Sequence, residues 1–481
     1  MIKIARSVLV AGSLLAAVAA AVPAQAAVPA QPPLRFVAGS STVTLDRYSD
    51  FGVYLDLGTH MVAGTSPFEI RVTRKSYAKP IVASQIVNGR ARKLPAGLLT
   101  NFEGLPGFLH VRLTDSGGAV VLDKDQTFCP NSETARTRPD APDTSPYPFG
   151  CSANPFALGG VWGVQKGWSA SIVDWSAGPI DIPVGTYTAK VNVPKRYQDL
   201  FGIPADQASA TIQVTVRNVE LPGPPAAGPA AAGPARAQAP QPNATRPTGA
   251  ASVPKGPKPD LRPLPAWWIG IAPQGGRDYL QFAANVWNAG PSPLVLDGFR
   301  RTGEKIMDAY QYFYDAKGKQ VGYAPTGTME WDARDGHNHW HFTDFASYRL
   351  LDSTQSETVR SQKEAFCLAA TDAIDYTVKN ANWRPNNTDL HTACGNEGSL
   401  AVREVLDVGS GDTYIQSLPG QSFDVTDLPN GTYYVQVIAN PEHNLYESNL
   451  TNNVSLRKVI LGGSPHSRTV TVPPHQLIDA P

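Results

Sequence analysis

Residues 429–439 read PNGTYYVQVIA, and this stretch indicates which fold the chain adopts. Asn430-Gly431 is a tight-turn signal, and the β-branched and aromatic residues after it are typical of a strand. Residues 278–286 show similar strand signals, and residues 211–216 (TIQVTV) alternate cleanly between apolar and polar. The 481 residues include 43 Pro and 42 Gly, which interrupt helices. We therefore expect an all-β protein of short strands, with a β-sandwich in each half.

The two halves also resemble each other. The PNGTY of 429–433 has a counterpart in PVGTY at 183–187, and Phe366-Cys367 has one in Phe128-Cys129. The AGPSP of 289–293 likewise follows the AGTSP of 63–67, and the order is the same throughout. We interpret this as the duplication of one sandwich domain. The alternative is chance similarity, because turn residues recur in any sandwich.

The N-terminus reads as a signal peptide over residues 1–26. Lys3 and Arg6 give it a positive start, an Ala/Leu/Val run follows, and residues 24–26 (AQA) form a cleavage pattern. We therefore expect a secreted, extracellular protein whose mature chain begins near Ala27. That compartment permits disulfides.

A linker is predicted in the middle of the chain. Residues 219–262 are rich in Pro, Ala and Gly and hold almost no large apolar residue, so we expect them to be disordered. They separate a first domain over 27–218 from a second over 263–481 that ends in a short Pro-rich tail.

Charge and hydropathy exclude two kinds of partner. Lys and Arg number 41, and Asp and Glu number 41, so there is no excess of basic residues for a nucleic-acid surface. After residue 30 no apolar run approaches the roughly 20 residues that a membrane-spanning helix needs. We expect neither a nucleic-acid partner nor a membrane span.

Four cysteines remain in the mature chain, two in each half: Cys129, Cys151, Cys367 and Cys394. They permit three pairings. We expect the bridges Cys129–Cys151 and Cys367–Cys394, one in each domain. Free thiols or a metal site are the alternatives, although no CxxC pair supports a metal.

Residues 335–342 read DGHNHWHF and place three of the nine histidines within five residues. On a strand, His337, His339 and His341 point to one face. Imidazole suits copper, zinc, iron or nickel. The first and third lie about 13 Å apart on a flat strand, at about 3.3 Å per residue, so one ion needs a bend, which Gly336 could supply. The alternative is a strand with surface histidines, or two ligands and a distant third.

The duplication extends this reading to the first half. When Thr114-Asp115 is aligned with Thr343-Asp344, Phe108, His110 and Arg112 fall opposite the three histidines. One histidine of three is kept, so we expect no equivalent ion in the first domain.

With these residues in view, the second half resembles the lysyl oxidase family over about residues 263–461. The family's copper motif runs Trp-His-x-Cys-His-x-His-x-His, and here Glu330-Trp331 is followed by the histidines of 337–341. Ala333-Arg334 stands in place of the leading Trp-His, and Gly336 in place of the Cys. Three further segments resemble the family, namely SQKEAFCL at 361–368, DTY at 412–414, and the closing strands with PNGTY at 429–433 and residues 447–454.

The resemblance implies a copper- and quinone-dependent amine oxidase. Its metal would be Cu(II), held by His337, His339 and His341, and its cofactor lysine tyrosylquinone, formed from Lys363 and Tyr414. Its substrates would be O₂ and primary amines, including lysine side chains of a protein, and its products aldehydes, ammonia and hydrogen peroxide. Lys363 must react as an unprotonated amine, so we expect it to be desolvated with a lowered pKa.

The resemblance also makes the first half a degenerate copy of a lysyl oxidase-like domain. Counting from the shared Gly-Thr-Tyr sets Trp168 opposite Tyr414, and counting from the shared cysteine sets Asp125 opposite Lys363. That domain would lack both cofactor precursors.

Several alternatives stay open. Asp412 and Asp344 are both candidates for the general base. Taken alone, Lys363 would be a solvated lysine and Tyr414 a half-buried strand tyrosine. The competing functions are a non-catalytic extracellular binding or adhesion protein with a structural metal site, and a metal oxidase or hydrolase without a quinone.

Overall fold

The computed structural model describes residues 34–48, 51–220 and 245–480, apart from 316, 335–336, 362, 364, 386–387, 389–392 and 416–419. The predicted signal peptide and residues 221–244 of the predicted linker lie outside the described residues. The described chain forms strands β1 to β31, one short α-helix, α1 (Lys195–Phe201), and the 3₁₀ turns η1 (Trp175–Ala177) and η2 (Ala205–Gln207). The all-β prediction is confirmed. In the part described, we find no helix of the length and apolarity that a bilayer crossing requires.

The strands of the first half form three sheets, and its core is one cluster of buried apolar side chains. The first sheet holds, in pairing order, β1 (Leu34–Ala38), β4 (Thr59–Ala63), β12 (Trp168–Ser171) and β10 (Ala135–Arg136). The second sheet holds β11 (Gly159–Val164), β5 (Phe68–Thr73), β6 (Val82–Val87) and β7 (Arg90–Lys93). The third sheet holds β3 (Gly52–Val53), β2 (Thr42–Tyr48), β14 (Ser209–Val219), β13 (Gly185–Asn192), β8 (Leu105–Asp115) and β9 (Val120–Phe128).

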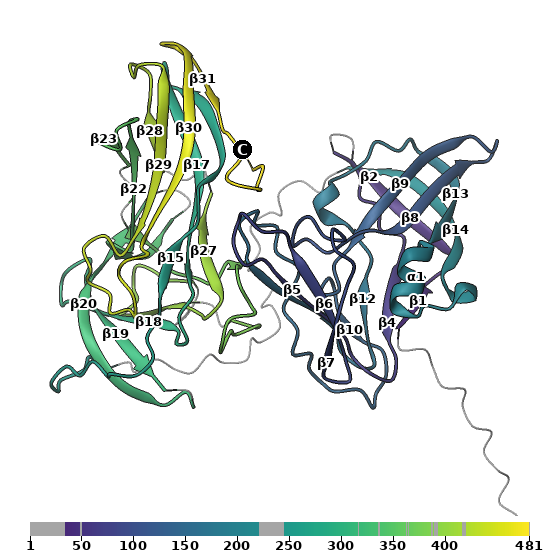
Figure 1. The fold of residues 1–481 in the computed structure, drawn as a ribbon, viewed down its shortest axis with the longest axis horizontal. Coiled ribbons are helices and arrows are strands. Elements are labelled where there is room, and N and C mark those ends of the chain that lie inside the picture. The colour runs from purple at the N-terminus through teal and green to yellow at the C-terminus, as the bar shows by residue number, and fades with distance from the viewer. Residues whose placement is uncertain are drawn as a thin grey trace, which may run out of the picture. The chain divides into compact units, whose positions relative to one another are not determined.

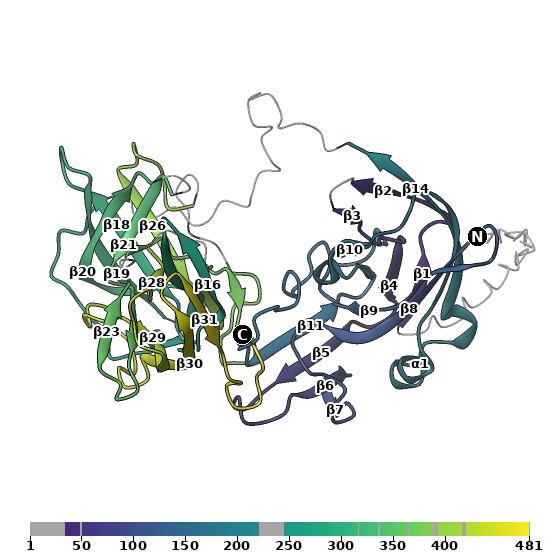
Figure 2. The same ribbon diagram turned by 90° about the horizontal axis from the view of Figure 1, so that it is seen from above.

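The second half also forms three sheets around its own core. The ribbons show β29 beside β30 and β31, and β18 to β21 together (Figures 1 and 2). The first sheet holds, in pairing order, β15 (Leu261–Pro263), β17 (Arg277–Asn288), β27 (Ser410–Tyr414) and β25 (Asp372–Ala373), and β16 (Trp267–Gln274) and β28 (Ser422–Asp424) also pair with β17. The second sheet holds β24 (Ala365–Phe366), β21 (His339–Thr343), β20 (Gln320–Asp332), β19 (Ile306–Tyr314), β18 (Leu294–Arg300) and β26 (Ala401–Leu406). The third sheet holds β23 (Glu357–Arg360), β22 (Ala346–Leu351), β29 (Gly431–Ala439), β30 (Val454–Ser464) and β31 (Ser467–Thr471).

The stretch PNGTYYVQVIA folds as its pattern predicts. Gly431 adopts a φ of +157°, which favours glycine, and begins β29. Along β29 every second residue is buried, from Tyr433 to Ala439. The Tyr433 hydroxyl donates a hydrogen bond of 2.8 Å to the Pro429 carbonyl, and in the first half Tyr187 donates one of 2.7 Å to Pro183. The repeated PxGTY motif thus builds the same corner twice.

The strand orders of the two halves correspond. The order β1-β4-β12-β10 has its counterpart in β15-β17-β27-β25, and β11-β5-β6-β7 in β26-β18-β19-β20. The order β14-β13-β8-β9 likewise corresponds to β30-β29-β22-β23. Different orders would have contradicted the duplication hypothesis, which this agreement supports.

Strand pairing corrects the alignment of the two halves around the histidines. Leu113 pairs with Ala189, two residues after Tyr187, and Leu350 pairs with Val435, two residues after Tyr433. Leu113 therefore corresponds to Leu350. By the same count Thr114-Asp115 matches residues 351–352 rather than Thr343-Asp344, which lie one strand earlier, and His110 matches Ser347.

The pairing next to the cysteines gives the same result. Leu105 pairs with Phe128 as Phe342 pairs with Phe366, so Gly104 takes the place of His341. The first half therefore has no histidine at the position of His341, and His110 lies instead beside Asp123 and Asp125.

The match of Trp168 with Tyr414 is also wrong. Trp168 is the first residue of β12, whereas Tyr414 is the last residue of β27, the strand in the corresponding place. The intervening loops differ in length, which defeats counting along the chain.

The C-terminal part of the predicted linker, residues 245–262, contacts the second half. Arg246 forms an ion pair of 2.6 Å with Asp308 on β19, and the Ser252 backbone N–H donates to the Tyr323 carbonyl on β20. Leu261 begins β15, which pairs with β17.

Both predicted disulfides are confirmed. Cys129 is bonded to Cys151 and Cys367 to Cys394. None of the cysteines is free.

Candidate metal and amine site

A turn brings the three histidine rings together. His337 precedes β21, which begins only at His339, and Asn338 between them has a φ of +52° in the left-handed region. The ring centroid of His337 lies 5.7 Å from that of His339 and 5.1 Å from that of His341. The ring centroids of His339 and His341 are 4.7 Å apart. The bend that a flat strand would have required is therefore present, at Asn338; Gly336 lies outside the described residues.

A carboxylate that the sequence did not reveal completes this cluster. Asp332 ends β20 and pairs across the strands with His339. Its Oδ2 atom contacts Nδ1 of His337 and lies 3.3 Å from Nδ1 of His341. Donor atoms of Asp332, His337 and His341 all lie within 4.8 Å of one another, which makes them a candidate metal site. No motif marks Asp332, since only the register of β20 on β21 brings it there.

The electrostatic environment keeps the innermost imidazole neutral. Burial, and next the positive charge of Lys363, lower the pKa of His341 to about 2. Its Nδ1 atom is buried and has no hydrogen-bond partner. Burial also raises the pKa of Asp332, but hydrogen bonds from Arg334 and His337 outweigh this and hold it well below the usual range. A neutral imidazole beside an ionised carboxylate is what a metal cation requires.

Lys363 is a buried lysine next to the histidines. Only 2% of the residue is exposed, and its Nζ donates a hydrogen bond of 3.2 Å to the Ala365 carbonyl. Nζ lies 4.9 Å from the ring centroids of both Phe366 and Tyr414. Burial, and next the charge of Arg334, lower the pKa of Lys363 to about 8. This is the desolvated amine that the resemblance requires at this position.

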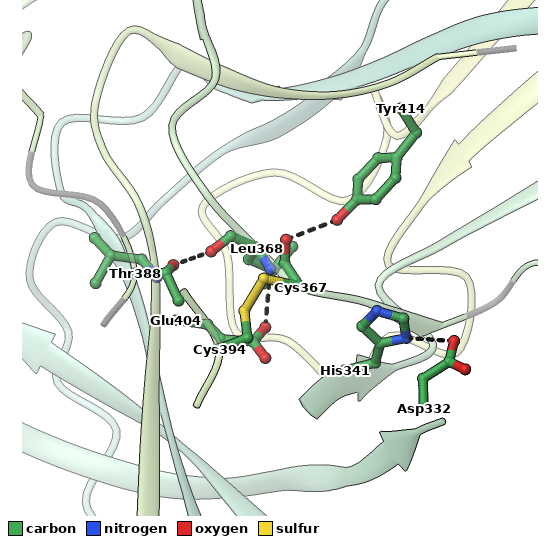
Figure 3. The surroundings of a disulfide bond; sticks show 9 residues. Asp332, His341, Cys367, Leu368, Thr388, Cys394, Glu404 and Tyr414 are labelled. Atoms are coloured by element: carbon green, nitrogen blue, oxygen red, sulfur yellow. Dashed lines mark hydrogen bonds and ion pairs between the residues drawn. A yellow bond between two sulfur atoms is a disulfide. The ribbon is translucent and has the colours of Figure 1, made fainter. Parts of the chain in front are cut away.

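Tyr414 approaches Lys363 from another sheet. Its ring meets Phe366 edge-on at 4.7 Å, and its hydroxyl donates a hydrogen bond of 2.7 Å to the Cys367 carbonyl (Figure 3). Burial, and next the charge of Asp412, raise the pKa of Tyr414 well above its usual value. The phenol is thus held as a neutral hydroxyl in a fixed orientation.

The disulfide Cys367–Cys394 links the segment next to Tyr414 to the histidine strand. Cys367 accepts the bond from Tyr414, and the carbonyl of Cys394 accepts a bond of 3.0 Å from the backbone N–H of Trp340, which lies between His339 and His341. Figure 3 shows Cys367 of the disulfide hydrogen-bonded to the Tyr414 hydroxyl, with His341 and Asp332 in the same view.

The two candidate bases differ in their surroundings. Asp412 lies on the strand of Tyr414 and interacts electrostatically with both Tyr414 and Lys363. Asp344 has its pKa raised by burial and then by Glu442. The geometry therefore brings Asp412, and not Asp344, to the amine and the phenol.

Comparison with known proteins finds one family. Residues 313–469 match the family model for lysyl oxidase. Human lysyl oxidase homolog 4 is 32% identical over 130 residues, which cover 27% of this chain and 15% of that protein. Lysyl oxidase homolog 2 of Xenopus tropicalis is 31% identical over 139 residues (28% and 16%), and homolog 2A of Danio rerio is 31% identical over 129 residues (27% and 16%).

The match is confined to one part of each protein, since it spans only about one sixth of the length of these curated relatives. Within this chain the matched region contains β20 to β30, and these strands and their loops contain every residue of the site described above. The C-terminal region of this chain, over residues 313–469, is therefore a lysyl oxidase family domain.

Proposed function

We propose that this protein is a secreted amine oxidase that depends on copper and on a quinone formed from Lys363 and Tyr414. It would convert primary amines, including the lysine side chains of a partner protein, to aldehydes with release of ammonia and hydrogen peroxide. The observation that carries the proposal is the position of the Lys363 Nζ, 4.9 Å from the centre of the Tyr414 ring.

The residues present fit a copper ion. His337, His339 and His341 would hold it, with Asp332 beside them, and imidazole nitrogen is a good copper ligand. The buried Nδ1 of His341 supports this, because it lies 3.3 Å from Asp332 but makes no hydrogen bond, and a buried polar atom without one is costly unless something binds it. Zinc would fit the same donors but has no redox chemistry.

When bound, the metal and the quinone supply the redox chemistry that carries electrons from the amine to O₂. The protein's own residues prepare the groups that react. Burial of Lys363 favours the neutral amine, whose lone pair can bond to the Tyr414 ring. Phe366 and the Cys367 carbonyl hold that ring in one orientation. Exclusion of water from the buried amine and phenol protects the reactive groups.

We propose that the remaining parts of the chain serve delivery and substrate recognition. Residues 1–26 would be a cleaved signal peptide, and the two disulfides are typical of an extracellular protein. Residues 27–218 would be a degenerate copy of the catalytic domain over 263–481, joined to it by the Pro/Ala-rich segment within 219–262. Such a tethered module would raise the local concentration of a polymeric substrate.

A second candidate function is a non-catalytic extracellular binding protein with structural zinc. The pair of histidines with Asp332 favours it, because nitrogen and carboxylate ligands are usual in zinc sites. A protein that contains only zinc and turns over no amine would support this candidate.

A peptide map by mass spectrometry tests the leading proposal. After aerobic loading with copper, the wild-type digest should contain one species in which the peptides of Lys363 and Tyr414 are covalently joined. Lys363→Ala and Tyr414→Phe should lack it. Lys305→Ala, which removes an exposed lysine paired with Glu397, should keep it. Copper-loaded wild type without this species and without quinone staining would refute the proposal.

A further inference from the structure

We propose that Asp412 is the general base of this site, and that its buried Oδ2 takes the proton from the carbon next to the nitrogen of the bound amine. The inference rests on the proposed amine oxidase function and assigns one step of it to a named atom.

Asp412 lies where a base must lie. It precedes Tyr414 by two residues on β27, and residues two apart on a strand project from the same face. Only 2% of Asp412 is exposed. It interacts with the Tyr414 hydroxyl and with the charge of Lys363, so it borders both groups from which the cofactor would form.

The Oδ2 atom of Asp412 stabilises the fold through no hydrogen bond. It is buried without a hydrogen-bond partner. A buried carboxylate oxygen that is left unpartnered costs free energy, and the general remedy is a partner or a proton. A substrate in the pocket would supply both, since the atom is free to accept a proton.

The groups that face Asp412 keep its proton affinity high. Burial raises the pKa of Asp412 well above its usual value, and the charge of Asp372 raises it further. Hydrogen bonds with Tyr414 and the Ala369 backbone, and then the charge of Lys363, lower this pKa but do not outweigh burial. The charge of Asp412 in turn raises the pKa values of Tyr348 and Glu404, which are also buried. A carboxylate with a raised pKa is a stronger proton acceptor than an ordinary aspartate.

The step balances as a proton transfer coupled to a two-electron reduction. The C–H bond next to the substrate nitrogen would break, and the quinone, when formed, would supply the two-electron acceptor for its electron pair, with O₂ as the final oxidant. The proton forms an O–H bond at Oδ2, so that the carboxylate becomes neutral. Water then takes this proton and regenerates the carboxylate.

The first half is consistent with this role. Strand β12 takes the place of β27 there, and its four residues read WSAS without a carboxylate. The strand in the place of β27 therefore holds neither a tyrosine nor a carboxylate.

The test compares the wild type with Asp412→Asn, Asp412→Glu and Asp372→Asn in the copper-loaded full chain. Copper content and thermal unfolding report on folding. Phenylhydrazine forms a coloured adduct with a quinone without any C–H cleavage, so its stoichiometry counts intact cofactor. Turnover of benzylamine and of its α-dideuterated form, measured against pH, reports on the base.

We expect Asp412→Asn to form the adduct like the wild type but to lose about 10²- to 10⁴-fold in kcat/KM. Asp412→Glu should recover part of this and keep an isotope effect. Asp372→Asn removes a negative charge that raises the pKa of Asp412, so the acid limb of kcat/KM should move to lower pH.

The outcomes separate the two proposals. A wild type that forms no adduct contradicts the amine oxidase function itself. A wild type that forms the adduct, with Asp412→Asn retaining turnover within about tenfold, overturns only the assignment of the base. An adduct missing only in Asp412→Asn overturns it too, because Asp412 would then act in building the cofactor. If Asp412→Asn does not fold, an acid limb that does not move in Asp372→Asn contradicts the assignment.

Discussion

The Nζ atom of Lys363 lies 4.9 Å from the centroid of the Tyr414 ring, although the two residues come from separate segments of the chain. Lys363 precedes β24, which pairs with the histidine strand β21, whereas Tyr414 ends β27, which pairs with β17. The contact therefore exists only in the folded chain. Folding must come before any bond between amine and ring, so the proposed cofactor would form in the native state.

Burial of an ammonium at position 363 predicts that Lys363→Met is more stable than the wild type at neutral pH. The pKa falls from 10.5 to about 8 on folding, a loss of about 3 kcal/mol at 1.36 kcal/mol per unit. Between these values the unfolded chain holds a proton that the folded chain lacks, so wild-type stability rises with pH. Chemical denaturation of copper-free protein from pH 7 to 10.5 should show the advantage of Lys363→Met shrinking as pH rises.

The opposite trend, or no difference at pH 7, would show that Lys363 is solvated in the folded state. Lys305→Met is the matched control, because Lys305 is exposed and its replacement removes no buried charge.

The copper content of the protein should depend on His341 and not on His110. His341 is buried among the other two rings, whereas His110 lies on β8 beside two exposed aspartates and has no counterpart at the candidate site. We expect His341→Ala to lower bound copper from about one equivalent to near zero, since a three-imidazole site that loses one ligand binds poorly. Elemental analysis after dialysis measures this. Copper retained by His341→Ala but lost from His110→Ala would place the metal in the first half.

The sequence predicted the fold class and the disulfides for local reasons. Turn signals such as Asn430-Gly431, and strands such as β29 with every second residue buried, depend on neighbours in the chain. Each disulfide joins cysteines within one half, so pairing by proximity was correct. The contribution of Asp332 was not predictable in this way, because it depends on the cross-strand register with His339.

Equivalent positions of the two halves were harder to predict than the duplication itself. The motif PxGTY is rigid, because its tyrosine is tied back to the proline carbonyl, and it therefore stays recognisable. A Thr-Asp pair is not a specific marker of this kind, since such residues suit many turns. The pair at 114–115 was aligned with 343–344 although strand pairing matches it to 351–352. The strand register, which carries no short sequence signature, shows that His110 is not equivalent to any of the three histidines.

Removal of either disulfide should cost similar stability, but only one should affect the cofactor. The bridges span 22 and 27 residues, so the model of loop closure expects about 3 kcal/mol from each. Cys367 and Cys394 also position Tyr414 and Trp340 through their carbonyls. The double variant Cys367→Ala/Cys394→Ala should therefore lose quinone staining at a temperature where Cys129→Ala/Cys151→Ala keeps it. Equal staining at equal fraction folded would show that the bridge has no positioning role.

The N-terminal boundary of the second half should lie before residue 245 and not at 263. Residues 245–262 contribute the Arg246–Asp308 ion pair, the Ser252–Tyr323 backbone bond and the first residues of β15. A chain that starts at residue 245 should keep these contacts, whereas one that starts at 264 loses the whole of β15 and exposes the edge of β17. We expect the shorter chain to unfold at a lower temperature and to bind less copper than the longer one. Identical unfolding curves would show that 245–262 belong to the linker.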